Sequence, residues 1–268
     1  MSKTCTVVVR DEAYCYIQGL RPQDHQFLFE HFAIYVEGHR FMPLFKLGRW
    51  NGKVNLFDAK TGKLLVRLLG EACEFLDAWG YDVKIDDQRR PVPVVKTRVT
   101  QEWFLNRGLE LDVTLRPYQV EAINLAIAAQ SGILEMATGA GKTLTVAALC
   151  DALNKDSGLR TIVVVPSSDL VDQTITSFHL VGLDVGCYSG STKDIEHDHV
   201  IATWQALQNN PQLLKQFDAI IIDECHGAAA KVIGELLNDH AAHCAYRYGC
   251  TGTIPKPKLD AYTIRGSL

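Results

Sequence analysis

The sequence contains no apolar run near the roughly eighteen residues that a membrane-spanning helix needs, and no apolar segment at its amino terminus. We therefore expect neither membrane insertion nor secretion. Its eight cysteines lack the paired spacing of a disulfide framework or a zinc site, which favours free thiols in a reducing cytoplasm. Internal repeats and low-complexity tracts are absent as well. With 268 residues, of which 47% are hydrophobic, the chain is long enough for a sizeable core in two domains.

A glycine-rich string, MATGAGKT at residues 136–143, follows the apolar residues 132–134 and precedes a helix-forming run at residues 144–153. This order predicts a strand, a glycine loop and a helix. Glycines let such a loop curl until its N–H groups face phosphate oxygens, and the helix amino terminus adds partial positive charge. Lys142 is then expected to reach the β- and γ-phosphates, and Thr143 to offer its hydroxyl to magnesium. The full pattern has glycine where Met136 stands, so the match is incomplete there. The residues expected to bind the nucleotide are Thr138, Gly139, Ala140, Gly141, Lys142 and Thr143.

An acidic string, DECH at residues 223–226, ends the apolar stretch of residues 217–222, which predicts a buried parallel strand. Asp223 would then stand at the carboxyl end of that strand, where open α/β sheets bind ligands. We expect Asp223 to hold magnesium, directly or through water, and Glu224 to polarise the attacking water. Either string alone can arise by chance. Together, in this order and each at a strand end, they predict one site for ATP and Mg²⁺.

Other strings resemble motifs of superfamily 2 helicases. LRPYQ, residues 115–119, precedes an amphipathic pattern with proline suited to its first turn, and it resembles the adenine-reading motif. That resemblance implies that Arg116 and Gln119 bind the base. Residues 163–173 resemble motif Ia and residues 202–205 the next strand-contacting motif, while TGT at residues 251–253 resembles motif III. The implied nucleic-acid contacts are Pro166, Ser167, Gln173, Thr203 and Trp204.

These motifs follow the family's order, cover residues 115–253 and point to the DExH group of this superfamily. The resemblance implies an α/β fold in which a P-loop RecA-like parallel sheet occupies residues 100–268. It also implies that His226 couples the γ-phosphate site to motif III, where Thr251 and Thr253 connect to the nucleic-acid groove. The family's second motor domain supplies transition-state arginines, and the fifteen residues after Thr253 cannot encode one. We therefore expect these 268 residues to bind nucleotide but to hydrolyse it poorly, since a missing arginine finger costs on the order of 10³ to 10⁵ in rate.

The front of the chain, residues 1–99, alternates like a small α+β domain. The pattern predicts strands at residues 4–10, 13–18 and 81–85, helices at 22–32 and 69–79, and a hairpin around Val54, Leu56 and the turn at 60–63. The join to the second domain is predicted between Asp86 and Thr100, where two prolines break the apolar periodicity. We place the boundary near residue 100.

Charge is uneven along the chain, although its total is only −4. Residues 1–100 carry 15 Lys and Arg against 12 Asp and Glu, whereas residues 101–268 carry 12 against 19. Between His39 and Arg67 there are seven basic residues and one acid, Asp58, with aromatic residues interleaved. Basic side chains neutralise phosphates, and aromatic faces stack on unpaired bases or wedge against a duplex end. The alternative is a hairpin with core aromatics and solvated lysines. The candidate nucleic-acid contacts are Arg40, Lys46, Arg49, Trp50 and Lys53.

The string RFMPLFKLGRWNGKVNLFD, residues 40–58, resembles the amino-terminal module of the UvsW-type helicases of T-even phages. This resemblance implies an ATP-dependent DNA helicase or translocase that remodels branched DNA in recombination and replication-fork repair, in the cytoplasm of an infected bacterium. Motifs Ia and III contact the sugar-phosphate backbone in DNA and RNA helicases alike, so the motor leaves an RNA helicase open. A nucleic-acid-binding accessory protein that uses ATP as a switch, without translocation, is also open.

Overall fold

The computed structural model describes residues 3–105, 107, 112–225, 230–252, 264 and 266–268. The chain divides into two compact units, residues 1–90 with 255–267 and residues 91–254 with 268. Each unit has its own hydrophobic core. No helix among the described residues combines the length and the apolar character that crossing a membrane requires.

The first unit is built on a five-stranded mixed sheet. Its strands are, in spatial order, β5 (Phe57–Asp58), β6 (Lys63–Leu65), β2 (Tyr14–Gln18), β1 (Lys3–Val9) and β7 (Tyr81–Asp87). β1 is parallel to β7, and the other pairs are antiparallel. Alternate residues of β1 face the core, where they meet α1 (Pro22–His31) and α3 (Leu69–Ala78), the latter preceded by the turn η2 (Val66–Leu68). The predicted α+β domain is thus confirmed.

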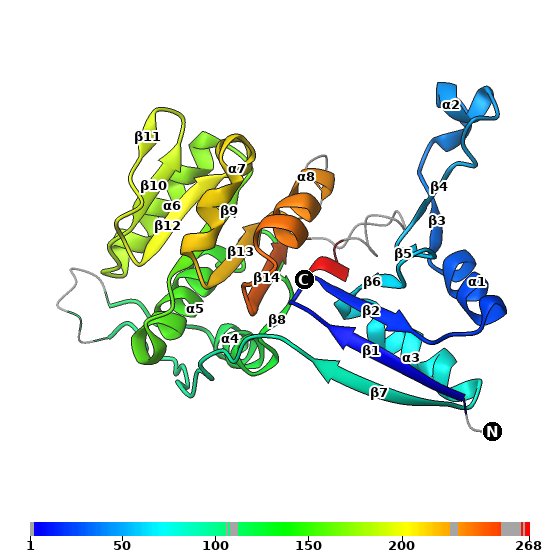
Figure 1. Cartoon of the computed structure of the whole chain (residues 1–268). Coiled ribbons are helices and arrows are strands. Elements are labelled where there is room, and N and C mark those ends of the chain that lie inside the picture. The colour runs from blue at the N-terminus through cyan, green and yellow to red at the C-terminus, as the bar shows by residue number, and fades with distance from the viewer. Residues whose placement is uncertain (1–2, 106, 108–111, 226–229, 253–263, 265) are drawn as a thin grey trace. The chain divides into compact units, whose positions relative to one another are not determined.

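A two-stranded ribbon also belongs to the first unit. β3 (Ala33–Tyr35) pairs antiparallel with β4 (Lys53–Asn55), and the segment between them contains η1 (His39–Phe41) and α2 (Pro43–Lys46). Figure 1 shows α2 at the end of the ribbon, away from β1 and β2. We refer to residues 36–52 as the ribbon tip.

The predicted hairpin is confirmed at β5 and β6, where the Asp58 carboxylate accepts a hydrogen bond from the backbone N–H of Lys60 at 2.8 Å. Val54 has a different partner from the one predicted. It pairs with Ile34 in the ribbon, because Leu56 bonds back to the Phe32 carbonyl (3.0 Å) and separates β4 from β5.

The second unit contains a seven-stranded sheet. Its spatial order is β11 (Thr192–Lys193), β10 (Gly186–Ser189), β12 (His199–Thr203), β9 (Thr161–Val165), β13 (Ala219–Asp223), β14 (Tyr246–Thr251) and β8 (Ser131–Glu135). All neighbouring strands are parallel except β10 and β11. β9 and β12 are buried throughout, as expected for strands that are covered on both faces.

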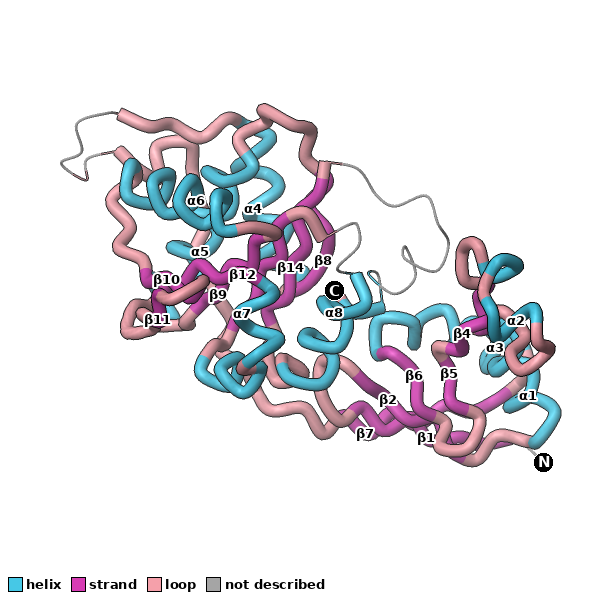
Figure 2. Tube along the Cα trace, turned by 90° about the horizontal axis from the view of Figure 1, so that it is seen from above, coloured by secondary structure: helices cyan, strands magenta, loops and turns pink. Residues whose placement is uncertain are grey.

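Helices cover both faces of this sheet. Figure 2 shows α4 (Pro117–Ala129), α5 (Lys142–Ser157) and α6 (Ser168–Leu180) on one side, and α7 (Trp204–Asn209) and α8 (Ala230–Glu235) on the other. The short helices η3 (Pro211–Gln216) and η4 (Leu236–His240) complete the unit. This is the predicted α/β fold with a P-loop RecA-like parallel sheet.

The compact units divide after Arg90, whereas the sequence places the boundary near residue 100. The difference arises because the intervening segment packs on the second unit. Val95 and Val99 are buried in its core, and their backbone N–H groups bond to Tyr246 (3.1 Å) and Asn124 (2.9 Å). The assignment of separate roles to the two domains stays a prediction.

Candidate functional site

Three strands of the second unit bring the predicted nucleotide residues to one edge of the sheet. In the parallel register Asp223 of β13 lies beside Cys250 of β14, and Thr251 of β14 lies beside Glu135 of β8. The glycine loop leaves β8 at this same edge. Sequence positions more than eighty residues apart therefore meet at the carboxyl ends of neighbouring strands, where open α/β sheets bind ligands.

The loop that follows β8 has the conformation that its glycines allow. Gly139 (φ 81°) and Gly141 (φ 78°) occupy the left-handed region, which residues with a Cβ avoid. Gly141 is the N-cap of α5, so this sixteen-residue helix begins at Lys142 and directs its free N–H groups toward the loop. Met136, the departure from the full pattern, is buried and donates its N–H to the Thr251 carbonyl at 2.8 Å. The Met136 backbone thus extends the sheet pairing, and the loop after it still has the conformation that Gly139 and Gly141 allow.

Lys142 lies between the two acids of the DECH string. Its Nζ donates a hydrogen bond to the Glu224 carboxylate and stands 3.5 Å from Asp223 Oδ1. Glu224 has a left-handed backbone (φ 48°), which is uncommon for residues other than glycine. Its N–H bonds to Asp223 Oδ1 at 2.9 Å. The predicted lysine and acidic pair therefore form one cluster.

Burial and charge compete in this cluster. Burial would lower the pKa of Lys142, but its hydrogen bond to Glu224 and the attraction of Asp223 and Glu224 outweigh that effect and raise it. Lys142 therefore stays charged. Burial raises the pKa of Asp223, and the nearby Lys142 ammonium offsets only part of that rise. An ionised Asp223 is thus held at the site at a cost to folding.

The string LRPYQ supports the glycine loop from behind. Gln119 is buried, with 2% of its surface exposed, and its Nε2 donates to the carbonyls of Ala140 and Gly141, both at 3.1 Å. Its Oε1 accepts from the Arg116 backbone N–H at 2.8 Å, which caps α4. Tyr118 belongs to the same string but was not among the predicted binding residues, and it donates its hydroxyl to the Ala140 carbonyl at 2.8 Å. Gln119 thus holds the loop here, and adenine recognition by Arg116 and Gln119 stays a prediction.

The hydroxyl and carboxylate oxygens at this edge of the sheet are suitable ligands for a magnesium ion that is already bound to a nucleotide. Among the described residues no group of three or more His, Cys, Asp and Glu side chains could hold a metal ion. Magnesium that is bound to a polyphosphate needs only one or two protein oxygens, because phosphate and water supply the others. Thr143, in the first turn of α5, and Asp223, at the end of β13, carry hard oxygens of this kind.

The predicted nucleic-acid residues of the second unit also gather at strand ends. Thr203 of β12 pairs in register with Val165 of β9, so Pro166 and Trp204 follow neighbouring strands. Gln205 Nε2 connects the two segments by donating to the Pro166 carbonyl at 3.3 Å. Ser167 is the exposed N-cap of α6, and Gln173 is exposed on that helix. Thr203 is buried and caps α7 through its hydroxyl (3.4 Å to the Ala206 N–H), while Trp204 is half-buried.

The predicted coupling residues are only partly described. Thr251 is fully buried at the end of β14, and its carbonyl accepts from Met136 at the start of the glycine loop. It is therefore in direct contact with the nucleotide loop. His226 and Thr253 lie outside the described residues, and their roles stay predictions.

The basic residues of the first unit lie on and beside the ribbon tip. Arg40, Lys46 and Arg49 are exposed. Trp50 is half-buried, with its indole N–H bonded to the Lys53 carbonyl (2.9 Å), and the Lys53 ammonium lies 4.8 Å from the centre of the Tyr35 ring. Trp50 thus helps to shape the ribbon, whereas the Phe41 and Tyr35 rings are exposed to solvent.

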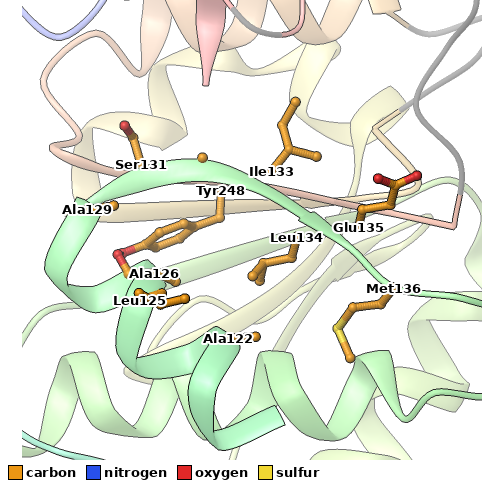
Figure 3. A pocket seen from close by; sticks show the side chains of 11 residues that line it. Ala122, Leu125, Ala126, Ala129, Ser131, Ile133, Leu134, Glu135, Met136 and Tyr248 are labelled. Carbon is orange, nitrogen blue, oxygen red and sulfur yellow. The ribbon is translucent and has the colours of Figure 1, made fainter. Parts of the chain in front are cut away.

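The second unit also contains an apolar cavity of about 330 Å³ between α4 and β8. Figure 3 shows Leu125 and Ala126 of α4, Leu134 of β8, Met136 just after β8, and Tyr248 around this space. The Tyr248 hydroxyl donates to the Ala126 carbonyl at 3.0 Å. The walls are therefore mostly hydrocarbon, and the charged residues Lys142, Asp223 and Glu224 do not line this cavity.

Two family models match the chain. Residues 112–256, more than half of the chain, match the type III restriction enzyme res subunit, and residues 7–86 match the amino-terminal module of the DNA helicase UvsW. The chain is 27% identical over 246 residues to the ATP-dependent DNA helicase uvsW of Enterobacteria phage T4, covering 85% of this chain and 48% of that protein. It is 25% identical over 208 residues to the DNA 3'-5' translocase XPB2 of Sulfurisphaera tokodaii, covering 70% and 46%.

Solved structures agree in fold. A crystal structure of the UvsW helicase from bacteriophage T4 superposes with a TM-score of 0.81 at 23% identity, over 99% of this chain and 98% of that one. A second structure of T4 UvsW gives 0.80 at 22% identity, over 99% and 56%. The chain spans less than half the length of the curated relatives that it matches. The expected helicase-type nucleotide domain behind a UvsW-like module is confirmed, and the chain belongs to the family of the type III restriction enzyme res subunit.

Proposed function

We propose that this chain is the nucleotide-binding part of an ATP-dependent DNA helicase or translocase. The observation that carries the proposal is the cluster of Lys142, Asp223 and Glu224 at the edge of a RecA-like sheet. A cation that faces two carboxylates beside a glycine loop matches what a magnesium-complexed triphosphate needs.

The side chains of the cluster have distinct roles in this proposal. Lys142 exchanges its carboxylate partners for β- and γ-phosphate oxygens, and this exchange frees Glu224 to accept a proton from the attacking water. Thr143 and Asp223 would hold the metal. A bound magnesium triphosphate supplies the phosphoanhydride bond that is cut and the metal charge that offsets the developing negative charge. His226, Thr251 and Thr253 would couple this step to nucleic acid.

DNA is the favoured substrate because two sequence relatives are a DNA helicase and a DNA 3'-5' translocase, and because residues 7–86 match the amino-terminal module of a DNA helicase. By likeness to the T4 helicase, we place the work of this chain in the remodelling of branched DNA during phage recombination and fork repair, in the cytoplasm of the infected cell. The exposed Arg40, Lys46 and Arg49 would neutralise phosphates there.

Competition between nucleic acids tests this proposal. The 268-residue chain is incubated with labelled forked DNA and then with unlabelled forked DNA or single-stranded RNA carrying the same number of phosphates. We expect forked DNA to compete more strongly. Stronger competition by RNA would instead support an RNA helicase, and strand displacement that survives Lys142→Ala in a longer form of the protein would contradict an ATP-driven motor.

The basic residues are tested in the same assay with Lys46→Ala combined with Arg49→Ala. DNA affinity should fall, and the slope of log K against log salt should flatten by roughly one for each phosphate that the variant no longer neutralises. Lys84→Ala removes an exposed lysine of β7 in the same unit and serves as the matched control. An unchanged slope in the double variant would remove the ribbon tip from the DNA interface.

A further inference from the structure

The ribbon tip exposes four large apolar side chains to solvent. Phe41 is 80% exposed, Leu47 65%, Leu44 55% and Met42 38%, all within seven residues. Single exposed apolar residues are ordinary, but a cluster of this kind marks a surface that meets a partner.

The tip is nevertheless an ordered element with its own small core. The His39 ring stacks on Tyr35 (centroids 4.7 Å apart) and meets the edge of Phe45 at 4.9 Å. Gly52 closes this packing, because a Cβ there would lie 2.5 Å from the His39 ring. Val36 N–H also bonds across the base of the tip to the Gly52 carbonyl at 2.9 Å. Some side chains therefore hold the tip together, while Phe41, Leu44 and Leu47 are left outside.

Cations surround the exposed apolar group. Arg40, Lys46 and Arg49 are exposed, and no acidic residue occurs from Gly38 to Phe57. A partner that suits this surface must present flat apolar faces next to negative charge. The end of a nucleic-acid duplex does so, since its last base pair is an exposed apolar plane between two phosphate backbones.

We propose that the ribbon tip is a wedge, in which Phe41, Leu44 and Leu47 stack against the terminal base pair at a duplex end or fork while Arg40, Lys46 and Arg49 hold the flanking phosphates. This inference rests on the proposed DNA function and deepens it, because it assigns recognition of a junction to a named surface. A lipid surface also accepts apolar and basic side chains, and binding to phosphatidylserine vesicles distinguishes it from a duplex end.

Two DNA molecules with equal numbers of base pairs distinguish wedge contacts from phosphate contacts. One is a fork, and the other is a duplex closed at both ends by hexaethylene glycol linkers, which has neither a free end nor unpaired bases. Both are titrated with the 268-residue chain by fluorescence anisotropy. The wild-type chain should prefer the fork, and Phe41→Ala with Leu44→Ala and Leu47→Ala should reduce that preference about tenfold, without changing affinity for the closed duplex.

Two further variants serve as controls. Ile85→Ala removes a side chain of β7 that is 63% exposed in the same unit, and both affinities should stay as in the wild type. Phe41→Trp keeps an aromatic face and should keep the fork preference. Circular dichroism checks that the triple variant retains the wild-type secondary structure, as expected for solvent-exposed positions.

Each remaining outcome overturns the wedge. A triple variant that keeps its fork preference, or that loses affinity for both DNA molecules equally, shows that the apolar group does not recognise the duplex end. Unchanged fork preference together with lost binding to phosphatidylserine vesicles would assign the tip to a lipid surface. A wild-type chain that binds neither DNA contradicts the proposed function itself, and the wedge with it.

Discussion

Burial at the site disfavours the ionised form of the Asp223 carboxylate. Its carboxylate is 20% exposed, and burial raises its pKa although Lys142 lies 3.5 Å away. Magnesium coordination requires the ionised form of the carboxylate, whereas burial of that ionised form lowers the stability of the fold.

This conflict gives a pH-dependent prediction for Asp223→Asn. A carboxyl group whose pKa is higher in the folded than in the unfolded chain lowers the free energy of unfolding as pH rises from its ordinary value of 3.8 through its raised value. The substitution removes that loss. Asp223→Asn should therefore be as stable as the wild type near pH 3 and more stable at neutral pH, while it loses magnesium-dependent nucleotide binding.

Urea unfolding at several pH values, with and without Mg²⁺ and ATP, measures both effects. Asp82→Asn, at an exposed position on β7, is the matched control and should show no gain at neutral pH. If the variant is less stable than the wild type at neutral pH, the attraction between Lys142 and Asp223 stabilises the fold by more than burial of the carboxylate destabilises it. That result would contradict the prediction.

At the scale of single residues, the sequence predicted the positions that belong to contiguous strings. Lys142, Thr143 and Asp223 follow strands that could be recognised from apolar runs, so their meeting at one edge was predictable. The bonds from Gln119 to the glycine loop join residues 21 and 22 positions apart on different elements, and no local pattern encodes them. The exposure of Phe41 and the burial of Trp50 depend in the same way on how the ribbon tip folds.

The start of α5 is the element on which the site depends most. Its N-cap, Gly141, combines a left-handed backbone (φ 78°) with close packing, because a Cβ there would lie 2.5 Å from Gln119 Nε2. The C-cap of the same helix, Gly158, has φ 63° with no atom within 4 Å of such a Cβ. Both glycines would strain a residue with a Cβ, but only at Gly141 would that Cβ also collide with a neighbouring side chain.

Replacing each of them with alanine should therefore give different results. Both substitutions should cost roughly 1 kcal/mol of stability for the left-handed conformation. Gly141→Ala should cost about 1 kcal/mol more by displacing the buried Gln119 amide from the loop carbonyls, and should weaken nucleotide binding. Gly158→Ala should leave nucleotide binding unchanged. Chemical denaturation and titration with a fluorescent ATP analogue measure the pair, and equal losses of binding would contradict a specific role for the Gln119 contact.

At the scale of elements, periodicity predicted α1, α3 and most strands of the first unit, because these elements alternate or repeat around one core. The short helices η1, α2 and η2 were not predicted. The ribbon was missed. β3 and β4 are three residues each and pair with each other alone, so their local pattern is too short to recognise. The spatial order of the large sheet was not predictable from the sequence either, since strand neighbours such as β8 and β14 are separated by more than a hundred residues.

For the whole molecule, two units with separate cores correspond to two separate family matches. The UvsW-like match, residues 7–86, lies within the first unit, and the match to residues 112–256 falls almost entirely in the second. The prolines at residues 91 and 93 led to a predicted boundary about ten residues after the observed one. The difference arises because Val95 and Val99, beyond these prolines, are buried in the second core. Composition and pattern thus predicted the number of units and the class of each.

Calorimetric titration of ATP with Mg²⁺ into the 268-residue chain tests whether Lys142 and the acidic pair form a site for magnesium-bound ATP. We expect one binding event that Lys142→Ala weakens at least about tenfold, since the variant cannot make the charge-assisted hydrogen bond to phosphate. Lys155→Ala, near the other end of α5, should bind as the wild type does. A wild-type chain that takes up no ATP, or a Lys142→Ala variant with unchanged affinity, would show that this cluster is not the ATP site.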